Sequence, residues 1–162
     1  MALYRTQGIV LRTYNYGEAN KIIVIFTRDY GKVKAVAKGV RKTKSRLGAS
    51  LEPFTCTKLM LYHKQNSDLH LVTHSSIVEP FAGIRLDLKK IYGGSYMLDV
   101  INEMMPEREH NLNVYRLLYN SLNLLESGSD TKKIIRWFES RILHMLGYRL
   151  HTARCVSCRK SR

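Results

Sequence analysis

The chain has 162 residues, enough for one ordinary domain or two small ones, and its 44% hydrophobic and 25% charged residues are values of a globular protein. The net charge of +14 is unusual, and a field of this sign attracts nucleic acid, an anionic membrane face or an acidic protein tail. No apolar run has the length of a secretory signal or a membrane span, and three cysteines are too few for a disulfide framework. We therefore expect a soluble cytoplasmic protein with a polyanionic partner.

The first 80 residues predict a small β-barrel. In residues 32–38, Val33, Ala35 and Ala37 alternate with lysines, so one face is apolar and the other cationic, interrupted by Val36. A long connection over 39–53 favours a closed five-stranded barrel of the OB type, although an SH3-like barrel fits nearly as well. The five expected strands, each bounded by turn residues, are Ile9–Tyr14, Lys21–Thr27, Lys32–Lys38, Thr55–His63 and Leu69–Ile77.

After Pro80 the apolar residues recur every three or four positions, which predicts three amphipathic helices. Pro106 and Gly147 suit the ends of the first and third, Asp130 or Ser129 can cap the third, and Gly93–Gly94 predicts a close approach of the first helix to the barrel. The expected fold class is α+β, with all strands before all helices. The expected domains are an OB-fold over 1–80, a helical domain over 81–150 and a basic tail with a CxxC over 151–162.

The stretch "KGVRKTKSR" at 38–46 contains five cations and no acid. Residues 1–50 hold eleven of the 27 Lys and Arg against only Glu18 and Asp29. Exposed tyrosines beside a cationic groove can stack unpaired bases, whereas Phe26 suits the core. A merely solvated loop and simple packing of the tyrosines are the alternatives. The expected nucleic-acid-binding residues are Arg12, Tyr14, Tyr16, Lys32, Lys34, Lys38, Arg41, Lys42, Lys44 and Arg46.

The sequence "CVSC" at 155–158 is half of a four-cysteine zinc site. Because the sequence ends four residues later and Cys56 lies in the expected barrel, we expect Cys155 and Cys158 to form an incomplete site. Zinc would then be a cofactor only if a second cysteine pair were supplied. The sequence has no phosphate-binding loop, nucleophile elbow or HExxH helix, so we expect no enzyme.

Three stretches carry a family resemblance: "GIVLRTYNYGEANKIIVIFTRDYGKVKAVAKGVRKTKSRLGASLEPF" (8–54), "RLDLKKIYGGSYMLDVI" (85–101) and "FESRILHMLGYRLHTARCVSC" (138–158). Their ordered motifs, among them A-K-G-x-R, S-R-x-G, L-E-P-F and L-G-Y, resemble the bacterial RecO recombination mediators over nearly the whole chain. The resemblance implies an N-terminal OB-fold, a helical domain, a cysteine-rich element and no catalytic turnover.

The resemblance further implies DNA repair and recombination in the RecFOR pathway, close to the bacterial nucleoid. Such proteins bind single- and double-stranded DNA, anneal strands, and help load the recombinase on DNA coated with single-strand binding protein. Their partners are RecR and the acidic C-terminal tail of single-strand binding protein. DNA binding is carried onto Lys38 and Arg41, with Lys42, Lys44 and Arg46 as extensions. For the acidic tail the candidates are Lys132, Lys133 and Arg136, with a solvated cationic face as the alternative.

RecO-like chains continue into a second cysteine pair and further helices, whereas this sequence ends at Arg162. We therefore expect a C-terminally shortened form. Two other functions stay open from the residues alone. One is a protein-binding adaptor for acidic peptide tails, and the other is an RNA- or ribosome-binding OB protein.

Overall fold

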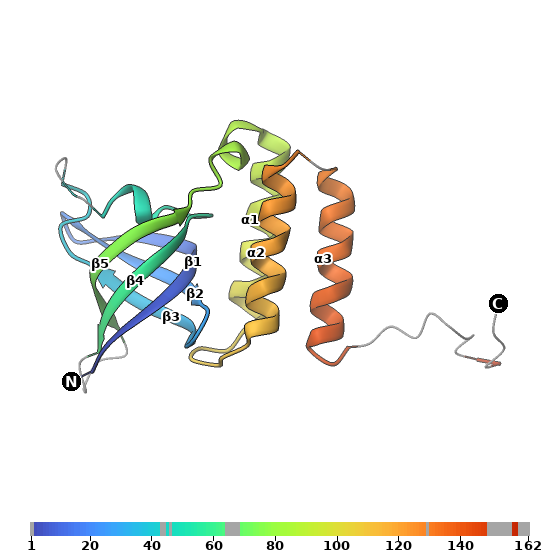
Figure 1. Cartoon of the computed structure of the whole chain (residues 1–162), viewed down its shortest axis with the longest axis horizontal. Coiled ribbons are helices and arrows are strands. Elements are labelled where there is room, and N and C mark those ends of the chain that lie inside the picture. Colours follow the sequence, from blue (N-terminus) through green and yellow to red (C-terminus); the bar gives the residue numbers. More distant parts are fainter. Residues whose placement is uncertain are drawn as a thin grey trace.

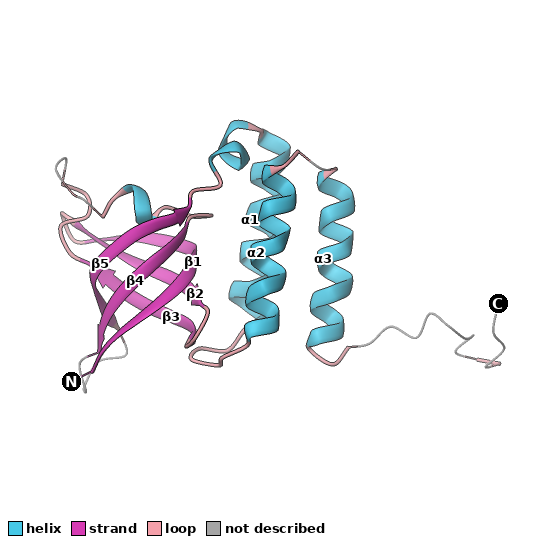
Figure 2. Cartoon of the chain, in the orientation of Figure 1, coloured by secondary structure: helices cyan, strands magenta, loops and turns pink. Residues whose placement is uncertain are grey.

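The structure, a computed structural model, describes residues 2–42, 45, 47–63, 69–128, 130–148 and 157–158. For Ala2 it describes the backbone alone. Five strands form a closed barrel, and three helices stand beside it as a second layer (Figures 1 and 2). The elements are β1 (Ala2–Tyr16), β2 (Asn20–Thr27), β3 (Gly31–Ala37), η1 (Ala49–Leu51), β4 (Cys56–His63), β5 (His70–Glu79), η2 (Ala82–Leu86), α1 (Leu88–Met104), α2 (Leu112–Glu126) and α3 (Thr131–Met145).

The strand order around the barrel is β1-β2-β3-β5-β4, closed by the pairing of β4 with β1. All neighbouring pairs are antiparallel except β3 and β5, which are parallel. This mixed five-stranded closure confirms the expected OB-type barrel over the SH3-like alternative. The first strand is longer than expected because its beginning pairs with β4 and its end with β2.

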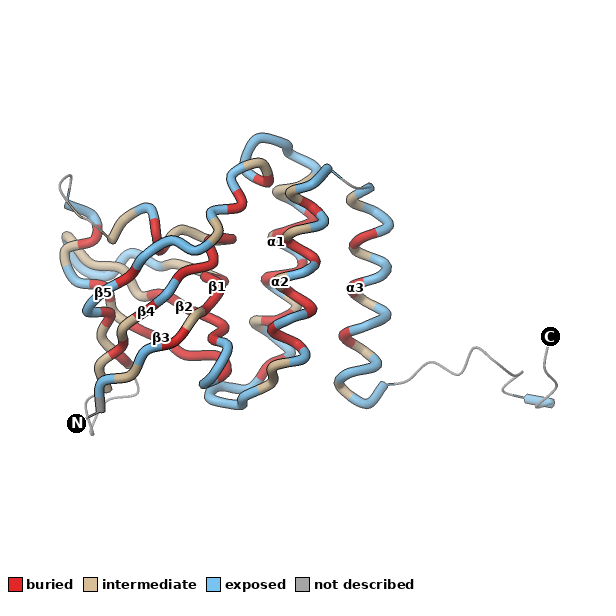
Figure 3. The backbone as a smooth tube through the Cα atoms, viewed as in Figure 1, coloured by how far each residue is buried: buried red, intermediate tan, exposed pale blue. Residues whose placement is uncertain are grey.

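Two apolar cores follow from the alternation of side chains along the strands. The barrel interior is filled by one set of side chains, including Val10, Ile23, Val33 and Leu61. The second core lies between the outer surface of β1 and β2 and the helices, and it includes Phe26, which is fully buried as expected. Figure 3 follows this burial along α1 and α2, while much of α3 is exposed.

The helix boundaries agree with the sequence signals. Asp130 caps α3, because its carboxylate accepts hydrogen bonds from the backbone N–H groups of Lys132 and Lys133. Gly94 approaches the barrel as expected, since an added Cβ would lie 2.8 Å from Cε1 of Phe54. Gly93 instead approaches α3, where an added Cβ would lie 2.6 Å from Cγ2 of Thr131. The close approach thus concerns both the barrel and a neighbouring helix.

The junction between barrel and helices is polar as well as apolar at its centre. Cys56 accepts a hydrogen bond from Nε2 of Gln7 and lies 3.6 Å from the hydroxyl of Tyr115. Burial raises the pKa of the Cys56 thiol and also the pKa of Tyr115. Both groups therefore stay protonated at neutral pH. The Cys56 side chain contributes to packing between the barrel and the helices.

Candidate nucleic-acid interface

The outer surface of β1, β2 and β3 has an open half and a covered half. The register pairs Tyr14 with Ile22 and Ile22 with Val36, so these three side chains lie in one row across the outer surface. Tyr14 is 48% exposed and Tyr16, two residues further along β1, is 52% exposed. Ile22 and Val36 are half-buried. Together Tyr14, Tyr16, Ile22 and Val36 form what we call the open half.

The covered half begins one step further along the same strands. Val24 and Phe26 are buried against the helices, and Lys32, opposite Phe26, is buried too. The ammonium group of Lys32 donates a hydrogen bond to the carbonyl oxygen of Asn102 in the last turn of α1. The alternation of residues in the sequence predicted that Lys32 lies on a cationic surface. In the structure, the connection between α1 and α2 covers Lys32.

Lys34 occupies the border between the two halves. Its ammonium group forms an ion pair with Glu107, and both side chains are about half exposed. The hydrogen bond from Lys34 lowers the pKa of the Glu107 carboxyl, so the pair stays ionised well below neutral pH. An exposed pair of this kind contributes little to stability, and Lys34 could exchange Glu107 for a phosphate.

The segment Lys38–Lys42 borders the open half on the β3 side, and local contacts fix it there. Val40 is buried in the barrel core, while Lys38, Arg41 and Lys42 are exposed. The backbone N–H of Arg41 donates to the carbonyl of Ala19, and its guanidinium donates to the carbonyl of Gly17. Because the turn between β1 and β2 is held beside the end of β3, Tyr16 and Arg41 belong to the same edge of the barrel.

Arg12 lies on the α1 side of the open half. Its guanidinium donates two hydrogen bonds to Oδ1 of Asp99, at 3.0 and 3.1 Å. A groove of about 510 Å³ runs between β1 and α1 here, lined by Arg12, Tyr14, Phe54 and Ser95 among others. Arg12 therefore has an acidic partner, unlike Lys38 and Lys42, for which the described residues provide no ion pair.

The predicted residues thus fall into three groups. Tyr14, Tyr16, Lys38, Arg41 and Lys42 come together at the open half. Arg12 and Lys34 lie at its borders, and Lys32 is buried away from it. Lys44 and Arg46 lie outside the described residues, and these ten assignments stay predictions. Sequence reasoning missed Ile22 and Val36, although Val36 was visible as an apolar residue among the lysines of β3.

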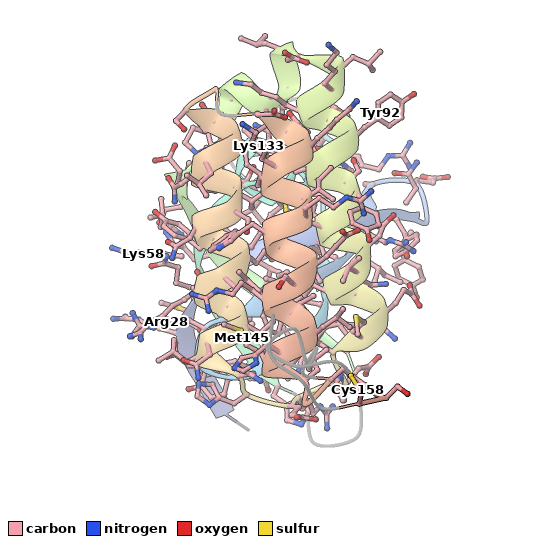
Figure 4. All side chains as sticks on the ribbon, turned by 90° about the vertical axis from the view of Figure 1, so that its right-hand side faces the viewer. Arg28, Lys58, Tyr92, Lys133, Met145 and Cys158 are labelled. Carbon is pink, nitrogen blue, oxygen red and sulfur yellow. The ribbon has the colours of Figure 1, made fainter. Side chains whose placement is uncertain are left out.

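The residues considered for an acidic tail lie on α3. Lys132, Lys133 and Arg136 are exposed, and Figure 4 shows Lys133 near the beginning of this helix. A pocket of about 450 Å³ between α1 and α3 is lined by Tyr96, Lys132, Ile135, Arg136 and Glu139. Glu139 accepts hydrogen bonds from Tyr96 at 2.8 Å and from Arg136 at 3.0 Å, and the former lowers its pKa. An arriving carboxylate would have to replace Glu139 at Arg136.

Metal binding is not supported by the part of the chain that the structure describes. No three His, Cys, Asp or Glu side chains within it are arranged to hold an ion. Cys158 is exposed, and Cys155 lies outside the described residues. The zinc expectation therefore stays a prediction. Among the described residues, no helix combines the length and apolar character needed to cross a bilayer.

Comparison with known proteins assigns the chain to a family. A family described as "Recombination protein O N terminal" matches residues 1–81, and "Recombination protein O C terminal" matches residues 85–162. The chain belongs to the RecO family. The family resemblance is thereby confirmed, as the structure confirms the expected barrel and helices, whereas the domain boundaries inside the chain stay predictions.

Several bacterial RecO proteins are similar over almost the whole chain. The DNA repair protein RecO of Halalkalibacterium halodurans is 34% identical over 158 residues, covering 98% of this chain and 61% of that protein. Those of Symbiobacterium thermophilum and Rubrobacter xylanophilus are each 37% identical, covering 98% of this chain and 62% and 63% of their own lengths. The chain thus spans somewhat less than two thirds of these relatives.

Proposed function

We propose that this RecO-family chain is a non-catalytic DNA repair and recombination mediator that binds DNA through the open half of its barrel. The observation that carries the proposal is the union of exposed rings and cations at one edge. Tyr14 and Tyr16 offer flat surfaces for stacking bases, and Lys38, Arg41 and Lys42 border them. The half-buried Ile22 and Val36 provide an apolar floor between rings and cations.

The covered half sets the direction of this binding. Because α1 and the following connection lie over Lys32 and Phe26, a bound strand runs over Tyr14 and Tyr16 toward Lys38 rather than along the full length of β3. The contacts are to phosphates and to the faces of bases, and neither kind reads sequence. Sequence-independent capture of single strands follows, with double strands bound through phosphates alone.

The remaining family-derived roles are part of the same proposal. Cations that neutralise two strands lower the repulsion between them, which favours annealing. Recombinase loading on DNA coated with single-strand binding protein, together with RecR, would use the strand so captured. The pocket lined by Tyr96, Lys132 and Arg136 is the candidate site for the acidic tail of single-strand binding protein. A cytoplasmic, nucleoid-associated location belongs to this role.

The test is fluorescence anisotropy of a labelled single-stranded oligonucleotide across a salt series. Removing Lys38 and Arg41 together (K38A/R41A) deletes two phosphate contacts, each worth about 1 kcal/mol against an anionic surface. We expect affinity at low salt to fall about thirtyfold. The log–log salt slope should become shallower by about 1.4, since each contact to a single strand contributes about 0.7.

The matched control removes the same charge elsewhere. Lys89 and Arg116 are exposed on α1 and α2 and are not among the residues that form or border the open half, so K89A/R116A should change affinity by much less. Equal losses in both double variants would mean that net charge alone attracts DNA, and the proposed site would be wrong. A parallel titration with RNA of the same sequence tests the RNA-binding alternative, which predicts the tighter complex with RNA.

A further inference from the structure

A second cationic surface lies on β1, β4 and β5. The register pairs Arg5 with Met60, Lys58 with Ser76, and Met60 with His74, which places these side chains on one outer sheet surface. They line a shallow groove of about 550 Å³. Arg5, Lys58, His74 and Ser76 are exposed, and Met60 is half-buried. We call this surface the second face.

The charge of the second face is positive. Arg28, in the turn between β2 and β3, adds a further cation at the groove, and its backbone N–H donates to the carbonyl of Gln7. Asp29 is the acid among the lining residues, and it is already engaged by Arg28 at 3.2 Å and by the hydroxyl of Thr6 at 2.7 Å. Within the described residues, no ion pair engages Arg5 or Lys58.

The second face is separate from the open half. Figure 4 shows Arg28 and Lys58 projecting from one side of the barrel, and the hairpin that joins β1 and β2 lies toward the other side. The open half uses the end of β1 with β2 and β3, whereas the second face uses the beginning of β1 with β4 and β5. One chain therefore presents two cationic surfaces with no shared side chain.

The composition of the second face identifies its occupant. Its described lining residues include no Phe, Tyr or Trp, and their one ring is the imidazole of His74, so cations dominate over rings that could stack bases. Arg5 and Lys58 are diagonal neighbours on adjacent strands, about 7–8 Å apart at the backbone. That separation suits consecutive phosphates of an extended strand.

We propose that the second face binds the phosphate backbone of a second nucleic-acid strand, whose bases point away from the protein. This inference rests on the proposed function, because the first strand occupies the open half. A strand held by phosphates alone keeps its pairing edges free. When two strands are bound to one chain, the effective concentration of each for the other is on the millimolar scale. Their unbound lengths can therefore pair readily. The two faces together therefore promote annealing.

The test counts strands per chain. A labelled thymidine oligonucleotide of about ten nucleotides, a length that one OB fold covers, cannot pair with itself and should bind twice per chain. The variant R5A/K58A should bind once, as should K38A/R41A, whereas K89A/R116A should still bind twice. Annealing of longer complementary strands, followed by energy transfer, should slow roughly tenfold in R5A/K58A because one tether is lost. Circular dichroism checks that each variant is folded.

Each other outcome has a definite meaning. If the unmodified chain binds one oligonucleotide and K38A/R41A removes it, the proposed function stands and the second face is wrong. If the unmodified chain binds none, the proposed function fails as well. If R5A/K58A still binds two strands, or anneals as fast as K89A/R116A, the inference is wrong. If it keeps both strands but loses binding of a polyglutamate peptide, the occupant is an acidic protein segment and the inference is also wrong.

Discussion

Gly31 is a point of close approach between the barrel and the connection from α1 to α2. It begins β3 with a φ of +67°, and a Cβ built there would lie 2.2 Å from the carbonyl oxygen of Glu109. The neighbouring backbone is tied to the same connection, since the N–H of Arg108 donates to the carbonyl of Lys32 at 2.9 Å. Replacing Gly31 with alanine therefore meets backbone atoms that cannot rotate away.

The cost of Gly31→Ala has two parts. A left-handed backbone costs a non-glycine residue about 1–2 kcal/mol. Forcing a methyl group into a closed contact adds about 1–3 kcal/mol. We expect the free energy of unfolding to fall by about 3 kcal/mol in total.

Gly17→Ala separates these two parts. Gly17 has a φ of +60°, but the nearest atom to an added Cβ is 4.0 Å away. This variant should lose only the backbone part, about 1 kcal/mol. Urea unfolding followed by circular dichroism measures both variants. If Gly31→Ala costs no more than Gly17→Ala, the close packing of barrel and helices inferred from Gly31 is wrong.

Two further predictions concern buried titratable side chains. Burial and the nearby His63 lower the pKa of His70, so the unfolded chain binds a proton that the folded chain does not. Above the unfolded pKa of about 6.5, His70 should not affect the free energy of unfolding. Below that pH, the free energy of unfolding should fall by at most about 1.4 kcal/mol per pH unit. In H70Q, the midpoint of urea unfolding should therefore change less with pH than in the unmodified chain. Lys32→Met should cost about 1–2 kcal/mol of stability, because the carbonyl of Asn102 loses a charged donor, yet leave the salt slope of DNA binding unchanged. By contrast, Lys38→Ala should leave stability unchanged and make that slope shallower by about 0.7.

Local patterns predicted the elements well because strand alternation and helical periodicity are recorded in neighbouring residues. The strand at β3 and the cap at Asp130 are examples. The same alternation predicted that Lys32 lies on a cationic surface, but alternation carries no information about what covers that surface. Whether the polar side of β3 faces water depends on the connection near Glu107, more than 70 residues away in the chain.

The candidate site was only partly predictable for a related reason. The tyrosines and Lys38 stood out by residue type, but the apolar floor of Ile22 and Val36 needs the register between β2 and β3. The second face was less visible still, because Arg5 and Lys58 come from distant parts of the sequence and are joined only by the pairing of β1 with β4. Cations dispersed in sequence form a surface only after the barrel closes.

The ion pair between Lys34 and Glu107 marks the place where the open half gives way to the helical layer. Under the proposed function, a nucleic-acid strand that reaches this border would meet the helical layer and would turn aside or stop there. The helices would thereby limit how many nucleotides one chain holds in line. Lengthening or removing the connection after α1 would then alter the footprint on DNA while every side chain proposed to contact DNA stayed the same.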